Sequence, residues 1–270
     1  MAAALHGFSG RHGPASGGRR RGGPDFRRCE GTGREMRGVA ILGLLLSAFC
    51  TPIGPAQAQS TPSLPKGTLV EYRTPNATDR DLAVILSGDG GWADLDKQLG
   101  TLLAGRGISV LGFDCMKYFW DTRSPEETAR DVNATLAAYL KAWDKDRVIL
   151  IGFSFGAAVL PFVLSRMPDP LRTKVALATM LGSNTYANWE IHWGDWLHDQ
   201  PHKSALPVPP ELAKLSGVRL LCVYGSEETK SSVCPGLNSR DVEVLQLPGG
   251  HHFDGDYNKL ADQILRRLPK

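Results

Sequence analysis

Strand-forming and helical patterns alternate along the chain from about residue 69 onward. Residues 82–86, 108–113, 148–151, 175–181, 218–224 and 242–247 predict strands, and residues 69–72 predict a further strand at the edge of the sheet. Helical patterns occupy intervals between them, among them residues 93–104 and 257–268. This alternation, without an internal repeat, predicts one α/β domain with a mostly parallel central sheet and helices on both faces.

A capping box marks the start of the helix that follows Ser124. Ser124 is expected at the N-cap, Pro125 at the first helical position and Glu127 at the third. The apolar positions after it recur at helical spacing and predict a stripe buried in the core: Ala129, Val132, Leu136, Tyr139, Leu140 and Trp143.

The first 58 residues have a different character. Residues 1–35 are rich in Gly and Arg and lack apolar periodicity, which predicts a disordered extension or sequence upstream of the true start. Residues 36–58 combine a positive start, an apolar run and a small-residue cleavage signal, a pattern typical of a secretory signal peptide. We therefore expect export and a single mature domain over residues 59–270.

Removal of the leader changes the charge and leaves three cysteines. The net charge of the whole chain is +3, but from Gln59 onward 23 Lys and Arg stand against 25 Asp and Glu. No basic tract remains to predict nucleic-acid binding. In an oxidising compartment we expect a disulfide between Cys222 and Cys234, which are close in sequence around a loop, and a shielded thiol at Cys115.

Ser154 lies in the motif with the strongest catalytic signal. Residues 152–156 read Gly-Phe-Ser-Phe-Gly, between a buried strand pattern and a stretch of small apolar residues. The two glycines let strand and helix approach closely, and the serine between them takes a strained turn conformation. A G-x-S-x-G string by itself is a weak signal, but with this context it predicts a nucleophile elbow. The N–H of Phe155 would point to where negative charge develops.

A glycine-rich turn follows the predicted strand at residues 82–86. Serine hydrolases place their second oxyanion donor at this position, so Asp89 and Gly90 are candidates beside Phe155. An ordinary turn from strand to helix is the alternative.

A nucleophilic serine needs a base, and the base needs an acid to hold it. Residues 248–256 lie between the last strand and the last helix, where an α/β-hydrolase carries its histidine. We place His252 first, because a histidine followed by Phe is the commoner arrangement there, and His251 second. Glu228, after the preceding strand, is the first choice of acid and Glu227 the second. The chain order Ser, acid, His is that of the α/β-hydrolases.

The same loop raises the question of a metal ion, because His251, His252, Asp254 and Asp256 stand close together. Adjacent histidines on a loop rarely point at one ion, and no second cluster of ligands completes a coordination shell. We expect this protein to bind neither a metal ion nor a cofactor.

The interval of residues 184–210 departs from the alternation of strands and helices. Trp189, Ile191 and Trp193 alternate with Glu190 and His192, and a proline-rich stretch follows. This period of two predicts an inserted strand or the edge of a lid that covers the site or meets lipid. Packing of the tryptophans into the core is the alternative, and the pattern favours neither.

Four blocks of sequence resemble the VirJ/AcvB family of bacterial periplasmic virulence proteins: residues 86–92, 118–120, 152–162 and 248–257. The resemblance covers essentially the whole predicted mature chain. Cys222 and Cys234 also look like that family, whereas Cys115 stands where a serine is expected.

The resemblance implies a periplasmic α/β-hydrolase that cleaves the aminoacyl ester of aminoacylated phosphatidylglycerol, in particular lysyl-phosphatidylglycerol at the membrane surface. It also implies a link of some members to type IV secretion. A cationic substrate group needs acidic partners, and the candidates on predicted loops are Asp89, Asp114, Asp254 and Asp256, with Trp92 beside them; a solvated loop surface is the alternative for each.

A non-catalytic adaptor of a secretion system, built on a hydrolase fold, is the second hypothesis. The presence of a serine, an acid and a histidine in the right order favours the enzyme, because an adaptor has no physical need for them.

Overall fold

The computed structural model describes residues 62–74, 80–192 and 200–269. These residues belong to one compact unit, residues 56–270. The predicted extension at residues 1–35 and the signal peptide at residues 36–58 lie outside the described part. Within that part, no helix is long and apolar enough to cross a membrane.

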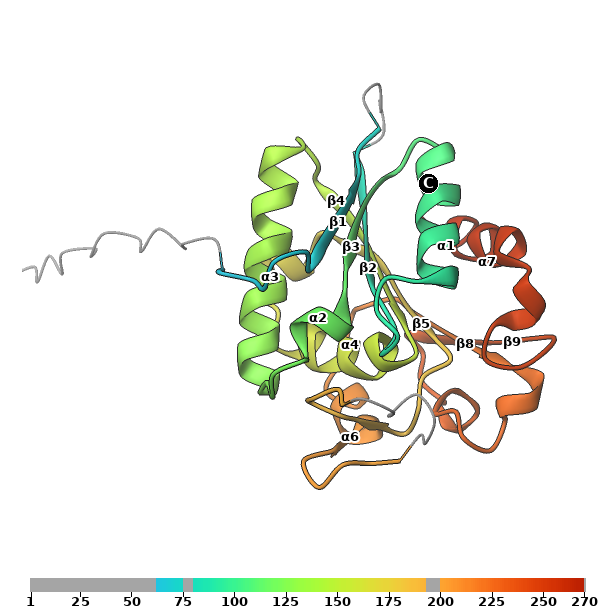
Figure 1. Cartoon of the computed structure of the whole chain (residues 1–270). Coiled ribbons are helices and arrows are strands. Elements are labelled where there is room, and N and C mark those ends of the chain that lie inside the picture. The colour runs from blue at the N-terminus through green and yellow to red at the C-terminus, as the bar shows by residue number, and fades with distance from the viewer. Residues whose placement is uncertain (1–61, 75–79, 193–199, 270) are drawn as a thin grey trace, which may run out of the picture. The chain divides into compact units, whose positions relative to one another are not determined.

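A seven-stranded sheet forms the centre of the unit (Figure 1). Its strands, in spatial order, are β1 (Leu69–Tyr72), β3 (Ser109–Phe113), β2 (Asp81–Leu86), β4 (Arg147–Phe153), β5 (Val175–Leu181), β8 (Leu220–Gly225) and β9 (Val242–Leu247). β1 pairs antiparallel with β3 at the edge, and the other pairs are parallel. The sequence prediction of a mostly parallel sheet with an edge strand is confirmed.

Helices cover both faces of the sheet (Figure 1). α3 (Pro125–Ala142) and α4 (Phe155–Ser165) lie on one face, and α1 (Asp94–Gly105) and α7 (Tyr257–Leu265) on the other. The short helices are α2 (Cys115–Tyr118), α5 (Asp169–Arg172) and α6 (Val208–Leu212). Three short 3₁₀ helices are η2 (Ser226–Glu228), η3 (Cys234–Gly236) and η4 (Phe253–Gly255). Two two-residue strands, β6 (Tyr186–Ala187) and β7 (Leu206–Pro207), pair apart from the main sheet.

The core consists of two apolar layers, one on each side of the sheet. Along β2, Leu82 and Val84 belong to the layer under α3 and α4, and Ala83 and Ile85 to the layer under α1 and α7. A strand covered on both faces needs apolar residues at every position, which explains the continuous apolar runs in the sequence.

The start of α3 matches its sequence signal in part. Ser124 Oγ accepts a hydrogen bond from the N–H of Glu127 at 3.1 Å, and Pro125 opens the helix. The carboxylate of Glu127 accepts a hydrogen bond from Arg123 at 2.7 Å. The serine half of the capping box is therefore present, while the glutamate pairs with a neighbouring cation.

Two large apolar residues of the interval between β5 and β8 pack inward. Trp189 and Ile191 are buried, and the Trp189 ring lies 5.0 Å from that of Phe162 and 6.2 Å from that of Phe119, measured between centroids. For these two residues the core alternative holds. Trp193, the third residue of the alternation, lies outside the described residues.

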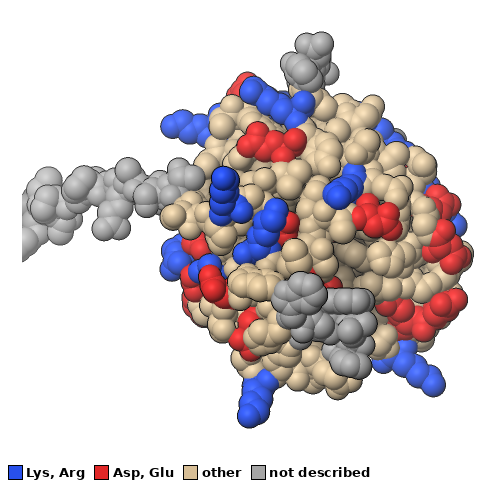
Figure 2. Space-filling view, viewed as in Figure 1, with Lys and Arg blue, Asp and Glu red and all other residues tan. Residues whose placement is uncertain are grey.

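Basic and acidic side chains are interspersed over the face of the molecule that Figure 2 shows. This mixture agrees with the near-balance of charge that the sequence has after Gln59. On the face that Figure 2 shows, the described residues form no extended patch of one sign.

Asp96 is a buried carboxyl on α1. It is 2% exposed, and its Oδ1 atom has no hydrogen-bond partner among the described residues. Burial raises the pKa of Asp96 to about 7, and the nearby charge of Asp114 acts in the same direction. The folded protein therefore favours the protonated form of this side chain.

Replacing Asp96 with Asn removes this titration. The folded-state pKa of about 7 lies above the usual 3.8, so the unfolded chain loses the proton first and the wild type loses stability as pH rises between those values. As pH rises through that interval, we expect the unfolding free energy of Asp96→Asn to increase relative to that of the wild type by up to about 1.4 kcal/mol per pH unit. Urea unfolding of both proteins at about pH 5 and about pH 8 measures the change; an equal difference at both values would contradict it.

Candidate active site

Ser154 lies on the sharp turn between β4 and α4. Its backbone angles are φ 52° and ψ −112°, a conformation that L-residues rarely adopt and that costs about 1–3 kcal/mol. The N–H of Ser154 donates a hydrogen bond to the carbonyl oxygen of Leu181 on the neighbouring strand at 2.8 Å. The nucleophile elbow predicted from the sequence is present.

The elbow depends on two glycines. A Cβ on Gly152 would lie 2.5 Å from the carbonyl oxygen of Gly156, and a Cβ on Gly156 would lie 2.3 Å from the carbonyl oxygen of Leu86. The obstructing atoms are backbone, so no side-chain rearrangement could relieve either contact. The missing Cβ atoms therefore allow β4, α4 and the end of β2 to meet.

The glycine-rich turn after β2 lies against the nucleophile. A Cβ on Gly88 would be 3.5 Å from the Cβ of Ser154. The turn closes with a hydrogen bond from the N–H of Gly91 to the carbonyl of Gly88 at 3.2 Å, and Asp89 lines the pocket that contains Ser154. Gly90 faces open space, since a Cβ there would meet nothing within 4 Å.

Phe155 also lines that pocket, at the first position of α4. The first N–H groups of a helix have no acceptor within the helix. Of the three residues predicted for the oxyanion hole, Asp89 and Phe155 line the pocket beside Ser154, whereas Gly90 is not among its lining residues.

His251 pairs with Glu228. The His251 Nδ1 and Glu228 Oε1 atoms are 2.5 Å apart. Burial raises the pKa of Glu228, but the hydrogen bond and the charge of His251 outweigh it and hold that pKa below the usual 4.5. Glu227, the second choice of acid, is exposed.

His251 also lies beside the elbow. Its ring centroid is 5.1 Å from that of Phe153, the residue before Ser154. A Cβ on Gly182 would lie 3.0 Å from the His251 ring, and Gly182 directly follows Leu181, the residue that accepts the Ser154 N–H. The pair of His251 and Glu228 therefore lies beside the turn that carries Ser154.

His252, the first choice from the sequence, has a different partner. Its Nδ1 atom lies 3.1 Å from the hydroxyl of Tyr257, which donates a hydrogen bond to Asp94 at 3.0 Å. The rings of the two histidines are nearly perpendicular, with an interplanar angle of 82°. The geometry thus favours His251 over His252, because adjacent loop residues point in different directions and only one of them reaches the acid.

Two of the acidic residues proposed for substrate binding, Asp114 and Asp256, make contacts within the fold. Asp114 is 3% exposed; it accepts a hydrogen bond from the N–H of Lys117 at 3.1 Å and lies 3.3 Å from the Lys117 ammonium. Asp256 caps α7 by accepting from the N–H of Lys259 at 3.0 Å. Asp254 is exposed, in a positive-φ position of η4.

Trp92 packs into the fold and not against Ser154. A Cβ on Gly112 would lie 2.5 Å from the Trp92 ring, and the indole N–H donates to the hydroxyl of Tyr72 at 3.3 Å. None of these four predicted substrate residues is among the residues that line the described pocket beside Ser154. Their place at the carboxyl ends of strands suggested a shared pocket, but Asp114 and Asp256 cap helices, Trp92 packs into the fold and Asp254 is exposed.

The pocket beside Ser154 is polar and contains two carboxylates. Asp89 and Glu190 line it, together with the amide side chains of Asn184, Asn188 and Gln200. Glu190 is not among the site residues predicted from the sequence. The signal was present, since Glu190 lies between the inward-facing Trp189 and Ile191 and must therefore face away from the core.

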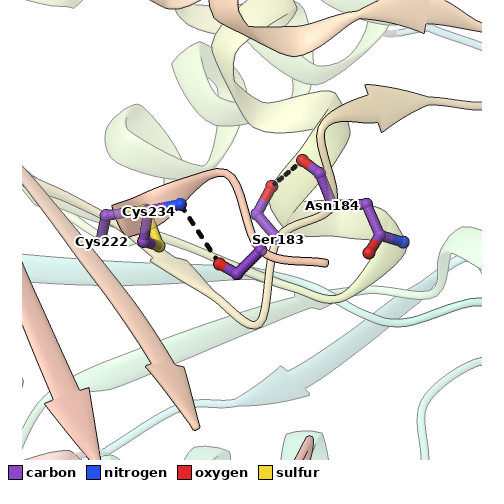
Figure 3. Close-up of a disulfide and its surroundings, with 5 residues drawn as sticks. Ser183, Asn184, Cys222 and Cys234 are labelled. Atoms are coloured by element: carbon purple, nitrogen blue, oxygen red, sulfur yellow. Dashed lines mark hydrogen bonds between the residues drawn. A yellow bond between two sulfur atoms is a disulfide. The ribbon is translucent and has the colours of Figure 1, made fainter. Parts of the chain in front are cut away.

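A disulfide joins Cys222 of β8 to Cys234 of η3, with 5.5 Å between the Cα atoms (Figure 3). This is the pair expected from the sequence. The loop it closes contains Glu228, and the N–H of Val233 donates to the carbonyl of Ser183 at 3.0 Å, beside the pocket residue Asn184. The disulfide therefore ties the loop of the acid to the pocket wall.

Cys115 is free and buried, as expected from the sequence. Burial raises the pKa of the Cys115 thiol, and the charges of Asp96 and Asp114 add to the effect. A thiol of this kind is a poor nucleophile.

The family of bacterial virulence protein VirJ matches residues 80–270. The chain belongs to this family. The resemblance that the four sequence blocks indicated is thereby confirmed. A comparison with curated proteins found no match.

Solved structures of α/β-hydrolases are similar to the VirJ-family chain described here. An α/β serine hydrolase homologue from Coxiella burnetii has a TM-score of 0.52 at 19% identity, over 74% of this chain and 91% of its own. Est1E from Butyrivibrio proteoclasticus with bound ferulic acid has a TM-score of 0.51 at 12% identity, over 73% and 93%. An esterase from Pyrococcus furiosus has a TM-score of 0.50 at 17% identity, over 72% and 83%. At these identities the likeness shows the α/β-hydrolase fold.

Removal of the disulfide should lower stability. We expect the double variant Cys222→Ala, Cys234→Ala to lose about 2–4 kcal/mol of unfolding free energy, because the bond closes a loop with a sequence separation of 12 in the unfolded chain. Cys115→Ala, which removes a buried sulfur that forms no disulfide, is the control. Denaturant unfolding compares the three proteins, and a double variant that is no less stable than Cys115→Ala would refute the expectation.

Proposed function

We propose that this protein is a serine hydrolase that cleaves the aminoacyl ester of aminoacylated phosphatidylglycerol, with lysyl-phosphatidylglycerol as the expected substrate. One observation carries the hydrolase assignment: Ser154 occupies a strained elbow, with the His251 and Glu228 pair beside it. The choice of lipid rests on the family resemblance and on the acidic character of the pocket.

Each member of the proposed triad has a distinct role. His251 takes the proton of the Ser154 hydroxyl as Ser154 attacks the ester carbonyl carbon. Glu228 holds the imidazole through Nδ1 and stabilises the imidazolium that forms. The lowered pKa of Glu228 keeps its carboxylate ionised for this purpose at neutral pH.

The oxyanion of the tetrahedral intermediate would be held by the N–H of Phe155 and by the turn at Asp89 and Gly90. Collapse of the intermediate breaks the ester C–O bond, and His251 gives the proton to the departing glycerol oxygen. Phosphatidylglycerol is released with a free hydroxyl, and the aminoacyl group remains on Ser154 as an ester. Water then attacks the aminoacyl ester on Ser154, with His251 again as base, and the free amino acid is released.

The carboxylates of the pocket suit a cationic acyl group. Asp89 and Glu190 both line the space next to Ser154. A lysyl ester carries two ammonium groups, and opposite charges in a partly enclosed pocket attract more strongly than in open water. An acidic pocket of this kind disfavours anionic acyl groups.

We place the protein in the periplasm. The predicted signal peptide supports export, and the disulfide between Cys222 and Cys234 supports an oxidising compartment. There the enzyme would meet its lipid substrate at the membrane surface.

A non-catalytic adaptor of a type IV secretion system is the second candidate. The description of the family as virulence proteins favours it. In that case the elbow and the pair of His251 and Glu228 would serve only to hold the fold.

Ser154→Ala separates the two candidates. With vesicles that contain lysyl-phosphatidylglycerol, we expect purified wild-type protein to release lysine and phosphatidylglycerol, and the variant to be slower by at least about 10³-fold. Thermal unfolding of both proteins is the control for folding. Equal release by both, or none by folded wild type, would remove support for this reaction.

His251→Ala and His252→Ala test which histidine is the base. We expect His251→Ala to lose about as much activity as Ser154→Ala. The double variant Ser154→Ala, His251→Ala should lose little more than either single variant, because members of a triad act as a unit. His252→Ala should cost less than about 10-fold, since His252 is held by Tyr257 and not by the acid. The reverse order of losses would assign the base to His252.

A further inference from the structure

A second group of ligand-type side chains lies at the rim of the Ser154 pocket. It consists of Glu190, His192 and His202, whose potential ligand atoms all lie within 4.8 Å of one another. The His192 Nε2 atom is 3.8 Å from Glu190 Oε2, and the His202 Nδ1 atom is 3.6 Å from Glu190 Oε1. The two imidazole rings stack, with centroids 5.2 Å apart. Two imidazoles and one carboxylate thus converge on one small volume.

Glu190 and His192 stand on either side of the buried Ile191, in a segment that follows β6 and has no regular secondary structure. Trp189 and Ile191 point into the core, so the residues that alternate with them face outward. The segment is pinned on both sides, because the N–H of Ile191 donates to the carbonyl of Phe119 and the carbonyl of Trp189 accepts from the N–H of Arg123, each at 2.8 Å. The backbone segment that carries Glu190 and His192 is therefore held in place by these two hydrogen bonds.

His202 is brought to them by Asn188. The Asn188 side chain accepts a hydrogen bond from the N–H of His202 at 2.9 Å and donates one to the carbonyl of Gln200 at 3.3 Å. These two hydrogen bonds hold the segment of Gln200 and His202 against the segment that carries Glu190. The position of His202 is thus set by the backbone, before any ligand binds.

Glu190 has an orienting partner of its own. The Thr122 hydroxyl donates a hydrogen bond to Glu190 Oε2 at 2.7 Å. Outer partners of this kind fix the direction of a carboxylate ligand and are a regular part of metal sites.

We propose that Glu190, His192 and His202 bind a zinc ion. Two imidazole nitrogens and one carboxylate oxygen, with a water as fourth ligand, form a set that zinc uses in proteins. Neighbouring ligand atoms of a tetrahedral zinc ion lie about 3.4 Å apart. The three ligand atoms lie within 4.8 Å of one another, so side-chain shifts of up to about 1.4 Å would bring them to this spacing. Calcium and magnesium prefer all-oxygen sites, which disfavours them here.

The ion would lie at the edge of the pocket beside the nucleophile, because Glu190 belongs both to the cluster and to the pocket lining. Zinc binding there does not require Ser154 to be catalytic. It can be measured without an ester substrate, so it stands or falls separately from the proposed hydrolase activity.

Isothermal titration calorimetry with zinc chloride tests the site. The purified protein used for it carries no histidine tag. We expect one tight site, weakened by at least about 100-fold in His192→Ala and in His202→Ala. Thr122→Val, which removes only the hydroxyl that orients Glu190, should weaken zinc binding by about 10- to 100-fold. His252→Ala removes an exposed histidine outside the cluster and should leave the affinity unchanged.

Cobalt(II) in place of zinc should show the visible absorption of a tetrahedral site, and that absorption should be lost in His202→Ala. Thermal unfolding without metal checks that each variant is folded. Wild-type protein that binds no zinc at micromolar concentrations, or folded His192→Ala and His202→Ala variants that bind it as tightly as the wild type, would overturn the proposal.

Discussion

The close contact of β4, α4 and the end of β2 is the constraint on which the site depends. At Gly152 and Gly156 the backbones are so near that a single methyl group would overlap a carbonyl oxygen. The chain can pass between strand and helix in this space only through a turn with positive φ, and Ser154 occupies that turn. The strain of about 1–3 kcal/mol is stored where the hydroxyl is displayed, and the buried layers on both sides of the sheet offset it.

The parallel sheet then collects the other parts of the site. Strands of one direction end at one edge, so the loops that follow them meet there although they are far apart in the sequence. The turn with Gly88 follows β2, Ser154 follows β4, Glu228 follows β8 and His251 follows β9. The disulfide after β8 adds a covalent restraint at the loop that carries the acid.

The insertion between β5 and β8 gives the pocket its chemical character. Its apolar residues, Trp189 among them, anchor it to the core, and the residues between them are turned outward. Glu190 therefore lines the pocket of Ser154 and also lies within ligand distance of the imidazoles of His192 and His202. A cation held by the histidines and a cationic acyl group in the pocket would compete for the same carboxylate, which physically couples the two proposed sites.

The sequence by itself determined what depends on neighbours along the chain. Apolar runs predicted the strands and the fold class, the spacing of glycines predicted the elbow at Ser154, and the nearness of Cys222 to Cys234 predicted the disulfide. The tertiary structure decided which of two adjacent histidines meets Glu228, and which acidic side chains face the pocket. Those outcomes depend on side-chain directions in irregular loops and on contacts between distant segments, such as the one that brings His202 to Glu190. No local pattern encodes these contacts, because the partners become neighbours only after the sheet has formed.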